Sequence, residues 1–390
     1  MHKPAPKIVR TLIAPDKFKG SLTAAEVAEA LAAGLRSAAS AAPVHCELLP
    51  LADGGDGSVD AAVASGFSLH SCTVAGPTGQ PVQASIAFDG VTAVVEVANT
   101  CGLGRLPDGR LEPLEASSRG FGDAVLFALG LRPARIVLAL GGSSSTDGGM
   151  GMLTALGFRF SDTDGAELRG SGANLRRIAS VSREAVPVLD GVELIVASDV
   201  HNPLLGPHGA PAVFAPQKGA SPDQVSALDA GLAHFVSVLT DAGLTNAAAL
   251  AHHEGAGSAG GIGFASLLLG AKQVSGADYF LELLDFDARA EECELVITGE
   301  GSIDEQTLSG KLPAAVARRS GPRTVIAVVG RSLLPKERWA ELPVSRVYAL
   351  AEYTELDSSK DAALSAELLR QIGRDIGERL ASPGDHLLVG

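Results

Sequence analysis

Short runs of apolar residues recur along this chain, and each run ends in a polar loop. The clearest covers residues 136–140, where Ile, Val, Leu, Ala and Leu follow one another. Runs without polar alternation are typical of strands buried on both faces of a parallel sheet. Similar, mostly apolar runs lie at residues 12–14, 47–51, 94–97, 194–196, 295–297, 324–329 and 347–350. Helical patterns follow most of them, so the chain is predicted to be an α/β protein with doubly wound parallel sheets.

Helix signals are clearest near both ends of the chain. Thr23 and Glu26 have the spacing of a capping box, in which each side chain accepts a hydrogen bond from the other residue's backbone. Val27, Leu31 and Leu35 follow at helical spacing and predict one buried face. A proline at position 313 favours a helix start, and we expect a helix over 313–319. The amphipathic pattern of residues 361–380 predicts the last helix.

The rhythm of strand and helix breaks in the middle of the chain. Turn residues at 76–81 are followed by strand-like alternation over 82–97, with Asp89 and Gly90 as a hairpin turn. Near residues 158–165 we expect either a second hairpin or a bent excursion of the chain. A chain of 390 residues is also too long for one ordinary core. We therefore expect two domains: a discontinuous doubly wound domain from residues 1–74 and 286–390, and a mixed α/β domain inserted at 75–285.

Composition narrows the class of protein. Apolar residues make up 46% of the chain, which allows a large core, but aromatic residues make up only 4%. The formal net charge is −14 without a basic cluster, so nucleic acid and anionic membranes are not expected as partners. No apolar run is long enough to span a membrane, and the four cysteines lack metal-ligand spacing. We expect free thiols in a cytoplasmic protein, and assembly as a homodimer stays open.

The run at 136–140 leads into a loop of glycines, hydroxyl side chains and one carboxylate, and a helix is predicted from Met150. Glycine N–H groups can approach a ligand closely, and a helix N-terminus favours negative charge. The loop is therefore interpreted as an anion site, most often for a phosphate. The alternative is an ordinary strand–helix turn, which also favours Gly, Ser and Asp. The candidate phosphate-binding residues are Gly141, Gly142, Ser143, Ser144, Thr146 and Asp147.

Carboxylates follow several of the apolar runs, at the strand ends where ligands bind to parallel sheets. Mg²⁺ bound with a nucleotide needs one or two carboxylates, and an acceptor hydroxyl needs one as base or orienting group. Two or three of these residues are therefore expected to act directly, and the others to be caps or neighbours. The carboxylates are Asp16, Asp53, Asp56, Asp147, Asp199, Glu300 and Asp304, and the candidate cations are Lys17, Lys19, Arg119, Lys218 and Lys311.

The glycines at 255–260 match GxGxxG, the pattern of a dinucleotide site. That pattern requires a strand directly before it, whereas residues 247–254 are rich in alanine and histidine and are predicted to be helical. We therefore interpret the run as a flexible glycine loop. A nucleotide-dependent dehydrogenase of a small hydroxy acid remains the alternative function, and a non-catalytic hydroxy-acid sensor is a third.

Nine blocks, in order across nearly the whole chain, resemble the type 1 glycerate kinase family. They are IAPDKFKGSLTA (13–24), LPLADGGDG (49–57), GPTGQPV (76–82), ASSRGFGD (116–123), GGSSSTDGGMGM (141–152), ASDVHNPLLGPHGA (197–210), FAPQKGAS (214–221), GAGSAGGIG (255–263) and VITGEGSIDEQTLSGK (296–311). Two positions depart from the family pattern: Lys17 stands where serine is usual, and Glu254 stands where proline is common.

The resemblance implies a two-domain kinase with a discontinuous flavodoxin-like domain and an inserted domain. It also implies that ATP and Mg²⁺ are used to phosphorylate D-glycerate, with 2-phosphoglycerate as the usual product. Asp16, Lys19, Ser21, Asp53, Asp147, Asp199, Asn202, Lys218, Glu300, Asp304 and Lys311 fall in the family's motif positions. We assign Asp199 and Lys311 to catalysis, Glu300 and Asp304 to the metal, Lys19, Ser21, Asp53, Arg119 and Asn202 to the substrate, and Lys218 with the 141–147 residues to the phosphates.

Overall fold

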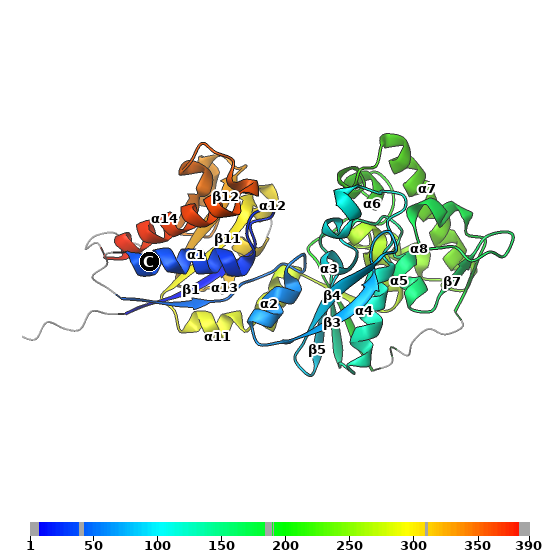
Figure 1. Cartoon of the computed structure of the whole chain (residues 1–390), viewed down its shortest axis with the longest axis horizontal. Helices are drawn as coiled ribbons and strands as arrows, with labels where there is room; N and C mark the ends of the chain where they lie inside the picture. Colours follow the sequence, from blue (N-terminus) through cyan, green and yellow to red (C-terminus); the bar gives the residue numbers. More distant parts are fainter. Residues whose placement is uncertain (1–7, 39–42, 184–188, 190, 309–310, 382–390) are drawn as a thin grey trace, which may run out of the picture. The chain divides into compact units, whose positions relative to one another are not determined.

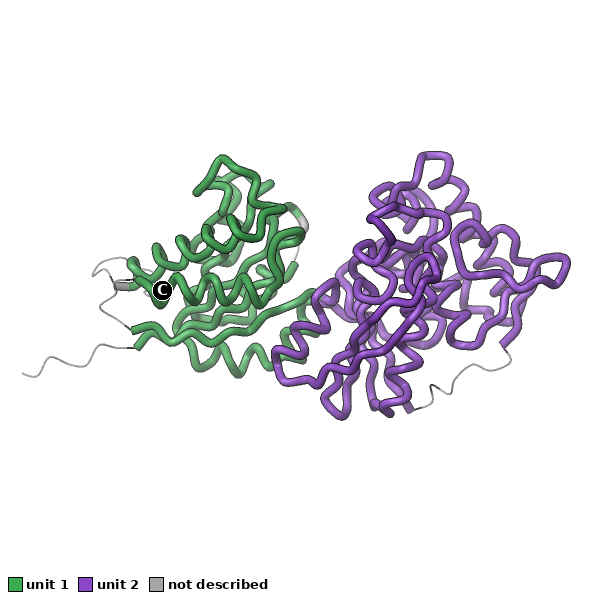
Figure 2. The backbone as a smooth tube through the Cα atoms, viewed as in Figure 1, with its two compact units in different colours: residues 1–53, 277–390 green, residues 54–276 purple. Residues whose placement is uncertain are grey.

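The chain forms two compact units in a computed structural model that describes residues 8–38, 43–183, 189, 191–308 and 311–381. Unit 1 comprises Met1–Asp53 and Ala277–Gly390, and unit 2 comprises Gly54–Gly276 (Figure 2). The sequence predicts domain borders at 74/75 and 285/286. A division into compact units does not define domains, so these borders stay a prediction. In the structure, residues 54–74 belong with unit 2, because the strand over Ser68–Ala75 pairs along its whole length with the strand over Pro81–Phe88.

Unit 1 is built on a five-stranded sheet in which every neighbouring pair is parallel. The strand order is β13-β12-β11-β1-β2, so counting the strands within the unit gives the flavodoxin order 2-1-3-4-5. This confirms the predicted doubly wound α/β fold. The strands are β1 (Val9–Pro15), β2 (Val44–Leu48), β11 (Leu295–Ile303), β12 (Thr324–Ser332) and β13 (Arg346–Ala349).

Helices α1 (Ala24–Ser37) and α14 (Ala362–Ala381) pack side by side in unit 1 (Figure 1). The capping box of Thr23 and Glu26 is present, which confirms the predicted helix start. Glycines let the two backbones come close, because a Cβ on Gly34 would lie 2.2 Å from the carbonyl oxygen of Arg370. The remaining helices of the unit are α10 (Gly276–Leu283, whose first residue belongs to unit 2), α11 (Phe286–Glu291), α12 (Glu305–Leu308) and α13 (Leu312–Arg319), with 3-10 turns over Lys336–Glu341, Leu350–Glu352 and Ser358–Lys360.

Strand β11 is longer than the sequence indicated. The apolar run was expected to end in a loop from residue 298, but the strand continues to Ile303 and pairs with β12 as far as Ser332. Two glycines allow this, because a Cβ on Gly299 would lie 2.0 Å from the carbonyl oxygen of Val328, and a Cβ on Gly330 would lie 2.5 Å from that of Gly301. The last block of the family resemblance also contains Ser309 and Gly310, which lie outside the described residues.

Unit 2 is built on a six-stranded sheet of order β10-β9-β6-β5-β4-β3. Strands β5, β6, β9 and β10 are parallel, and β3, β4 and β5 are antiparallel neighbours, which confirms the hairpin predicted at residues 89–90. A small separate pair, β7 (Arg159–Ser161) and β8 (Ser180–Ser182), is also antiparallel. The other strands are β3 (Ser68–Ala75), β4 (Pro81–Phe88), β5 (Thr92–Glu96), β6 (Arg135–Ala139), β9 (Glu193–Ala197) and β10 (Lys272–Val274).

The helices of unit 2 surround one large apolar core that includes Phe121, Phe160, Phe235 and Phe264. All four cysteines of the chain are free thiols, as expected. None of the described helices is long and apolar enough to cross a membrane. The helices are α2 (Ser58–Ala64), α3 (Val97–Cys101), α4 (Arg119–Gly130), α5 (Met150–Ala155), α6 (Ala210–Phe214), α7 (Pro222–Asp241), α8 (Ala247–Leu250) and α9 (Ile262–Leu268), with 3-10 turns over Leu103–Arg105, Pro107–Gly109, Gly172–Arg177, Pro216–Lys218 and Ser258–Gly261.

Candidate functional site

The strand order of unit 1 reverses between β1 and β11, and ligands of such sheets bind beyond the carboxyl ends of the strands at that point. The register places Pro15 opposite Gly299, and the N–H of Asp16 donates to the carbonyl oxygen of Gly299 at 2.8 Å. Asp16 and Glu300 are therefore the next residues along the two central strands. The sequence brings two carboxyl groups to the position where the fold favours a ligand.

Asp16 is buried although it can carry a charge. Burial raises the pKa of its carboxyl group to about 7, and the neighbouring charge of Asp53 acts in the same direction. Lys17 opposes this rise: its ammonium group lies 3.5 Å from the Asp16 carboxylate and its backbone N–H donates to it at 2.7 Å. Lys17 therefore compensates part of the negative charge at the switch point, at the position where the family usually has serine.

Glu300 lies in a similar environment, within the part of β11 that the sequence did not indicate. Burial raises the pKa of its carboxyl group to about 7, the charges of Asp16 and Asp304 raise it further, and a hydrogen bond from Thr307 and the charge of Lys311 lower it. The ammonium group of Lys311 lies 3.3 Å from one oxygen of Asp304. The three predicted residues Glu300, Asp304 and Lys311 therefore share one environment.

Lys19 and Ser21 lie in a tight turn after β1. An isolated bridge joins Phe18 to Leu22, and the Ser21 hydroxyl donates to the Phe18 carbonyl oxygen at 3.2 Å. The turn also passes close to β11, because a Cβ on Gly301 would lie 3.2 Å from the backbone nitrogen of Lys19. Lys19 is exposed, so its ammonium group is accessible to a ligand.

The carboxylates of unit 1 fit a divalent cation that a phosphate ligand completes. No group of three or more His, Cys, Asp or Glu side chains is placed to hold a metal by itself anywhere in the described part of the chain. Mg²⁺ does not need such a group, since it typically takes one or two carboxylates with phosphate and water oxygens. Burial is the main cause of the raised pKa values of Asp16 and Glu300, and the nearby carboxylates add to it. Glu300 and Asp304 offer the oxygen donors that a hard cation prefers.

In unit 2, the glycine- and hydroxyl-rich loop is largely internal. Residues 143–149 are buried, whereas Gly142 is exposed and Gly141 is half-buried. The Asp147 carboxylate accepts hydrogen bonds from the Ser118 backbone and hydroxyl at 2.9 and 2.8 Å and from the N–H groups of Gly149 and Gly151 at 3.1 Å. Asp147 therefore ties the loop to the starts of helices α4 and α5.

Lys218 is a buried lysine beside the same loop. Its ammonium group donates to the Ser143 hydroxyl at 2.8 Å and to the Ser145 carbonyl oxygen at 2.5 Å, and only 3% of the residue is exposed. Burial lowers the pKa of Lys218 to about 8, although the neighbouring Asp147 opposes the fall. The structure thus brings Lys218, Ser143 and Asp147 together. The buried ammonium group of Lys218 holds the loop through its two hydrogen bonds. Ser144 bonds instead to the Cys101 carbonyl oxygen at 2.7 Å, and the Thr146 hydroxyl has no partner among the described residues.

The other predicted residues of unit 2 lie at its surface. Asp199 is exposed beyond β9, and one of its oxygens accepts a hydrogen bond from the Gly276 N–H at 2.9 Å. The Asn202 amide donates to the His208 carbonyl oxygen at 2.8 Å, which fixes the loop between them. Arg119 begins α4 and lies 3.8 Å from Asp123. The GxGxxG run follows the short helix α8 rather than a strand, so the context of a dinucleotide site is missing.

Two buried residues were missed by the sequence analysis. Glu96 ends β5 and accepts a hydrogen bond from the Val59 N–H at 3.1 Å, at the start of α2. Thr307 is fully buried and donates to Glu300 at 2.7 Å. A local signal existed only for Thr307, because Asp304 precedes it by three residues, as a helix cap does.

A flavodoxin-type sheet with carboxylates and lysines at the switch point of its two central strands is typical of α/β enzymes. The sequence profile of the glycerate kinase family matches residues 11–381, so this chain belongs to the glycerate kinase family and is a kinase, an enzyme that transfers a phosphoryl group.

Named relatives agree with this assignment. The chain is 42% identical over 330 residues to the glycerate kinase of Bacillus subtilis (strain 168), covering 83% of this chain and 85% of the relative. It is 38% identical over 330 residues to the glycerate 2-kinase of Escherichia coli (strain K12), with coverage of 83% and 85%. A crystal structure with the provisional name glycerate kinase 2, from Salmonella typhimurium LT2, matches with a TM-score of 0.79 and 34% identity over 96% of this chain and 98% of that one.

Proposed function

We propose that this kinase transfers the terminal phosphoryl group of ATP to D-glycerate and that the product is 2-phosphoglycerate. The observation that carries the proposal is the cluster of Asp16, Glu300, Asp304 and Lys311 at the switch point of a flavodoxin-type sheet. Relatives that are named glycerate kinase, one of them glycerate 2-kinase, support the choice of substrate and product.

In unit 1, Glu300 and Asp304 would hold Mg²⁺, which neutralises charge on the phosphates when it is bound. Lys311 follows them directly before α13 and would add a positive charge for the transferred group. Lys19, Ser21 and Asp53 are proposed to bind the carboxylate and hydroxyl groups of glycerate. Phosphoryl transfer depends mainly on positioning and charge neutralisation, which such a set of side chains supplies.

In unit 2, Asp199 is proposed as the group that accepts the proton of the attacking hydroxyl. An oxygen–phosphorus bond to glycerate forms while the bond between the terminal phosphorus and the bridging oxygen of ATP breaks, and ADP leaves. Arg119 and Asn202 are proposed as further substrate contacts. The loop from Gly141 to Asp147, braced by Lys218, is proposed to contact phosphate, with the exposed Gly142 N–H as its most accessible donor.

A coupled assay with purified protein, ATP, Mg²⁺ and D-glycerate tests the proposal. Enolase added without a mutase reports 2-phosphoglycerate only, so a signal that needs the mutase would assign the 3-isomer. Glu300→Gln and Asp199→Asn are each expected to lower kcat by about 10²–10³, as the loss of an electrostatic donor does in other enzymes. Glu337→Gln, at an exposed position in the 3-10 turn of the same unit as Glu300, is the matched control and is expected to keep wild-type activity.

Two results would overturn the proposal. The first is absence of ADP formation that depends on D-glycerate. The second is an unchanged kcat in both Glu300→Gln and Asp199→Asn, which would remove both residues from the reaction. Titration with NADH, followed by its fluorescence, separates the dehydrogenase alternative, for which we expect no binding.

A further inference from the structure

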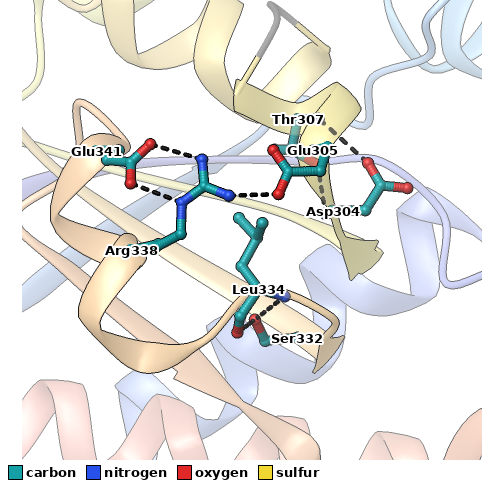
Figure 3. Close-up of polar contacts among 7 residues, drawn as sticks. All are labelled: Asp304, Glu305, Thr307, Ser332, Leu334, Arg338 and Glu341. Carbon is teal, nitrogen blue, oxygen red and sulfur yellow. Dashed lines mark hydrogen bonds and ion pairs between the residues drawn. The ribbon is translucent and has the colours of Figure 1, made fainter.

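We propose that Thr307 is a positioning residue for the Glu300 carboxylate: its hydroxyl holds one oxygen, Oε1, and thereby sets the direction in which the other oxygen, Oε2, meets a divalent cation. The inference deepens the proposed function and rests on it, because Glu300 is taken as a ligand of Mg²⁺. It names a residue outside the motif positions assigned from the sequence. Figure 3 shows Thr307 beside Asp304 and Glu305 at the start of α12.

The direction of the hydrogen bonds follows from their chemistry. The backbone N–H of Asp304 can only donate, and it lies 3.1 Å from the Thr307 hydroxyl oxygen. That oxygen therefore accepts, and its own proton is left for Glu300 Oε1, which lies 2.7 Å away. The hydrogen bond from Thr307 thus occupies one lone pair of Oε1, which makes Oε2 the oxygen more readily available to a ligand.

Thr307 has little freedom to release this hydrogen bond. It is fully buried, and its own N–H donates back to Asp304 Oδ1 at 3.2 Å, so the two residues cap each other. Helix α12 has only four residues and would not be stable alone. A second contact holds it: Arg338 forks onto Glu341 with bonds of 2.7 and 2.8 Å and also bonds Glu305 (Figure 3).

The neighbouring charges explain why the orientation of the Glu300 carboxylate depends on a hydrogen bond. Asp16 and Asp304 repel Glu300, and Lys311 attracts it. Without the Thr307 hydroxyl, Glu300 would turn toward the Lys311 ammonium group, which pairs with Asp304 in the structure. A carboxylate that orients toward lysine is a poor metal ligand. Outer hydrogen bonds of this kind typically change metal affinity by about 10- to 100-fold.

The test compares Thr307→Val with Thr307→Ser, which keeps the hydroxyl. Mn²⁺ binding is measured by isothermal titration calorimetry with the Mn²⁺ complex of a non-hydrolysable ATP analogue, and kcat and KM are measured with Mg²⁺, ATP and D-glycerate. The matched control is Thr11→Val, the same change at a buried threonine of β1 whose hydroxyl has no partner among the described residues. Thermal melts check that each variant is folded.

We expect Thr307→Val to weaken Mn²⁺ binding and to lower kcat, each by about 10-fold or more, while Thr307→Ser and Thr11→Val stay within about threefold of wild type. In the double variant with Glu300→Gln, removal of Thr307 should cost no further affinity, because Thr307 acts through Glu300. If Thr307→Val does not fold, Thr307→Ala is judged by the same criteria.

Three results would overturn the inference. One is Mn²⁺ binding by Thr307→Val as tight as by wild type. Another is an additive loss in the double variant, which would show a merely structural role. The third is a wild-type chain that does not bind Mn²⁺. Failure of the glycerate assay with intact Mn²⁺ binding and the expected variant pattern would instead reject the substrate and leave the role of Thr307 standing.

Discussion

At the scale of single residues, Glu96 is a buried carboxyl group of unit 2. Its oxygen accepts from Val59 N–H at 3.1 Å, while Asp56 and Asp60 add negative charge nearby. Burial raises the pKa of Glu96 from 4.5 to about 7. The group is therefore a source of pH dependence for the fold that lies outside the proposed chemistry.

The sign of this dependence follows from proton binding. Below about pH 4.5 the group is protonated in both states, and between about 4.5 and 7 only the folded state keeps the proton. The contribution of Glu96 to stability is thus largest in acid, falls as pH rises, and levels off above about pH 7. A shift of this size corresponds to at most about 3 kcal/mol.

Glu96→Gln should remove this dependence. We expect its free energy of unfolding, relative to wild type, to be clearly higher at pH 8 than at pH 5, because the glutamine amide never becomes charged. Denaturant unfolding at the two pH values measures the difference. Glu115→Gln, at an exposed position of the same unit, is the control. An equal difference between Glu96→Gln and wild type at both pH values would contradict the prediction.

At the scale of elements, the close approach of β11 and β12 places Glu300. Gly299→Ala would bring a methyl carbon to 2.0 Å from the Val328 carbonyl oxygen, and this oxygen belongs to the backbone, so no side-chain rotation can relieve the contact. The strands would have to separate, so we expect a loss of about 3 kcal/mol in stability and a fall in kcat, because Glu300 is the next residue. Thermal melts and the coupled assay measure the two effects.

Gly130→Ala is the matched control for Gly299→Ala, at a position where the added methyl group has room. Nothing lies within 4 Å of a Cβ on Gly130, the last residue of α4, and its φ is not positive. We expect stability to rise by up to about 1 kcal/mol, as for alanine in a helix. If Gly299→Ala behaved in the same way, the steric account of β11 would be wrong.

Comparison with the sequence shows which elements could be predicted. The capped helix α1 and the apolar strands β1, β6 and β9 were found because their signals are local. The continuation of β11 could not be found, because glycine extends a strand only when the neighbouring backbone comes close, and that neighbour is β12. The position of Lys218 inside unit 2 likewise depends on the tertiary fold, since an isolated lysine in a sequence is usually exposed.

At the scale of the whole molecule, unit 2 is one continuous segment with its own six-stranded sheet and core. We expect the fragment 54–276 to fold alone, with cooperative thermal unfolding and helix and strand signals in circular dichroism. It should have no kinase activity, because it lacks Asp16, Glu300 and Lys311.

The fragment 75–285, which follows the domain borders predicted from sequence, is the comparison. It removes α2 and nearly all of β3, and it adds most of α10. We expect it to melt at a lower temperature than the fragment 54–276. Equal melting temperatures would show that residues 54–74 are not needed by unit 2, whereas an unfolded 54–276 would show that unit 2 does not fold alone.

The separation of the two central strands of unit 1 along the chain has a consequence for biosynthesis. The backbone N–H of Arg10 in β1 donates to Glu294 beside β11, and the two residues are 284 positions apart in the sequence. A ribosome that adds about 5–20 residues per second needs roughly 15–60 s to cover that distance. During this interval unit 2 can already be complete, whereas β1 and β2 have no third strand and form a marginal pair. We therefore expect chaperones to bind the newly synthesised segment that contains β1 and β2 until β11 has left the ribosome.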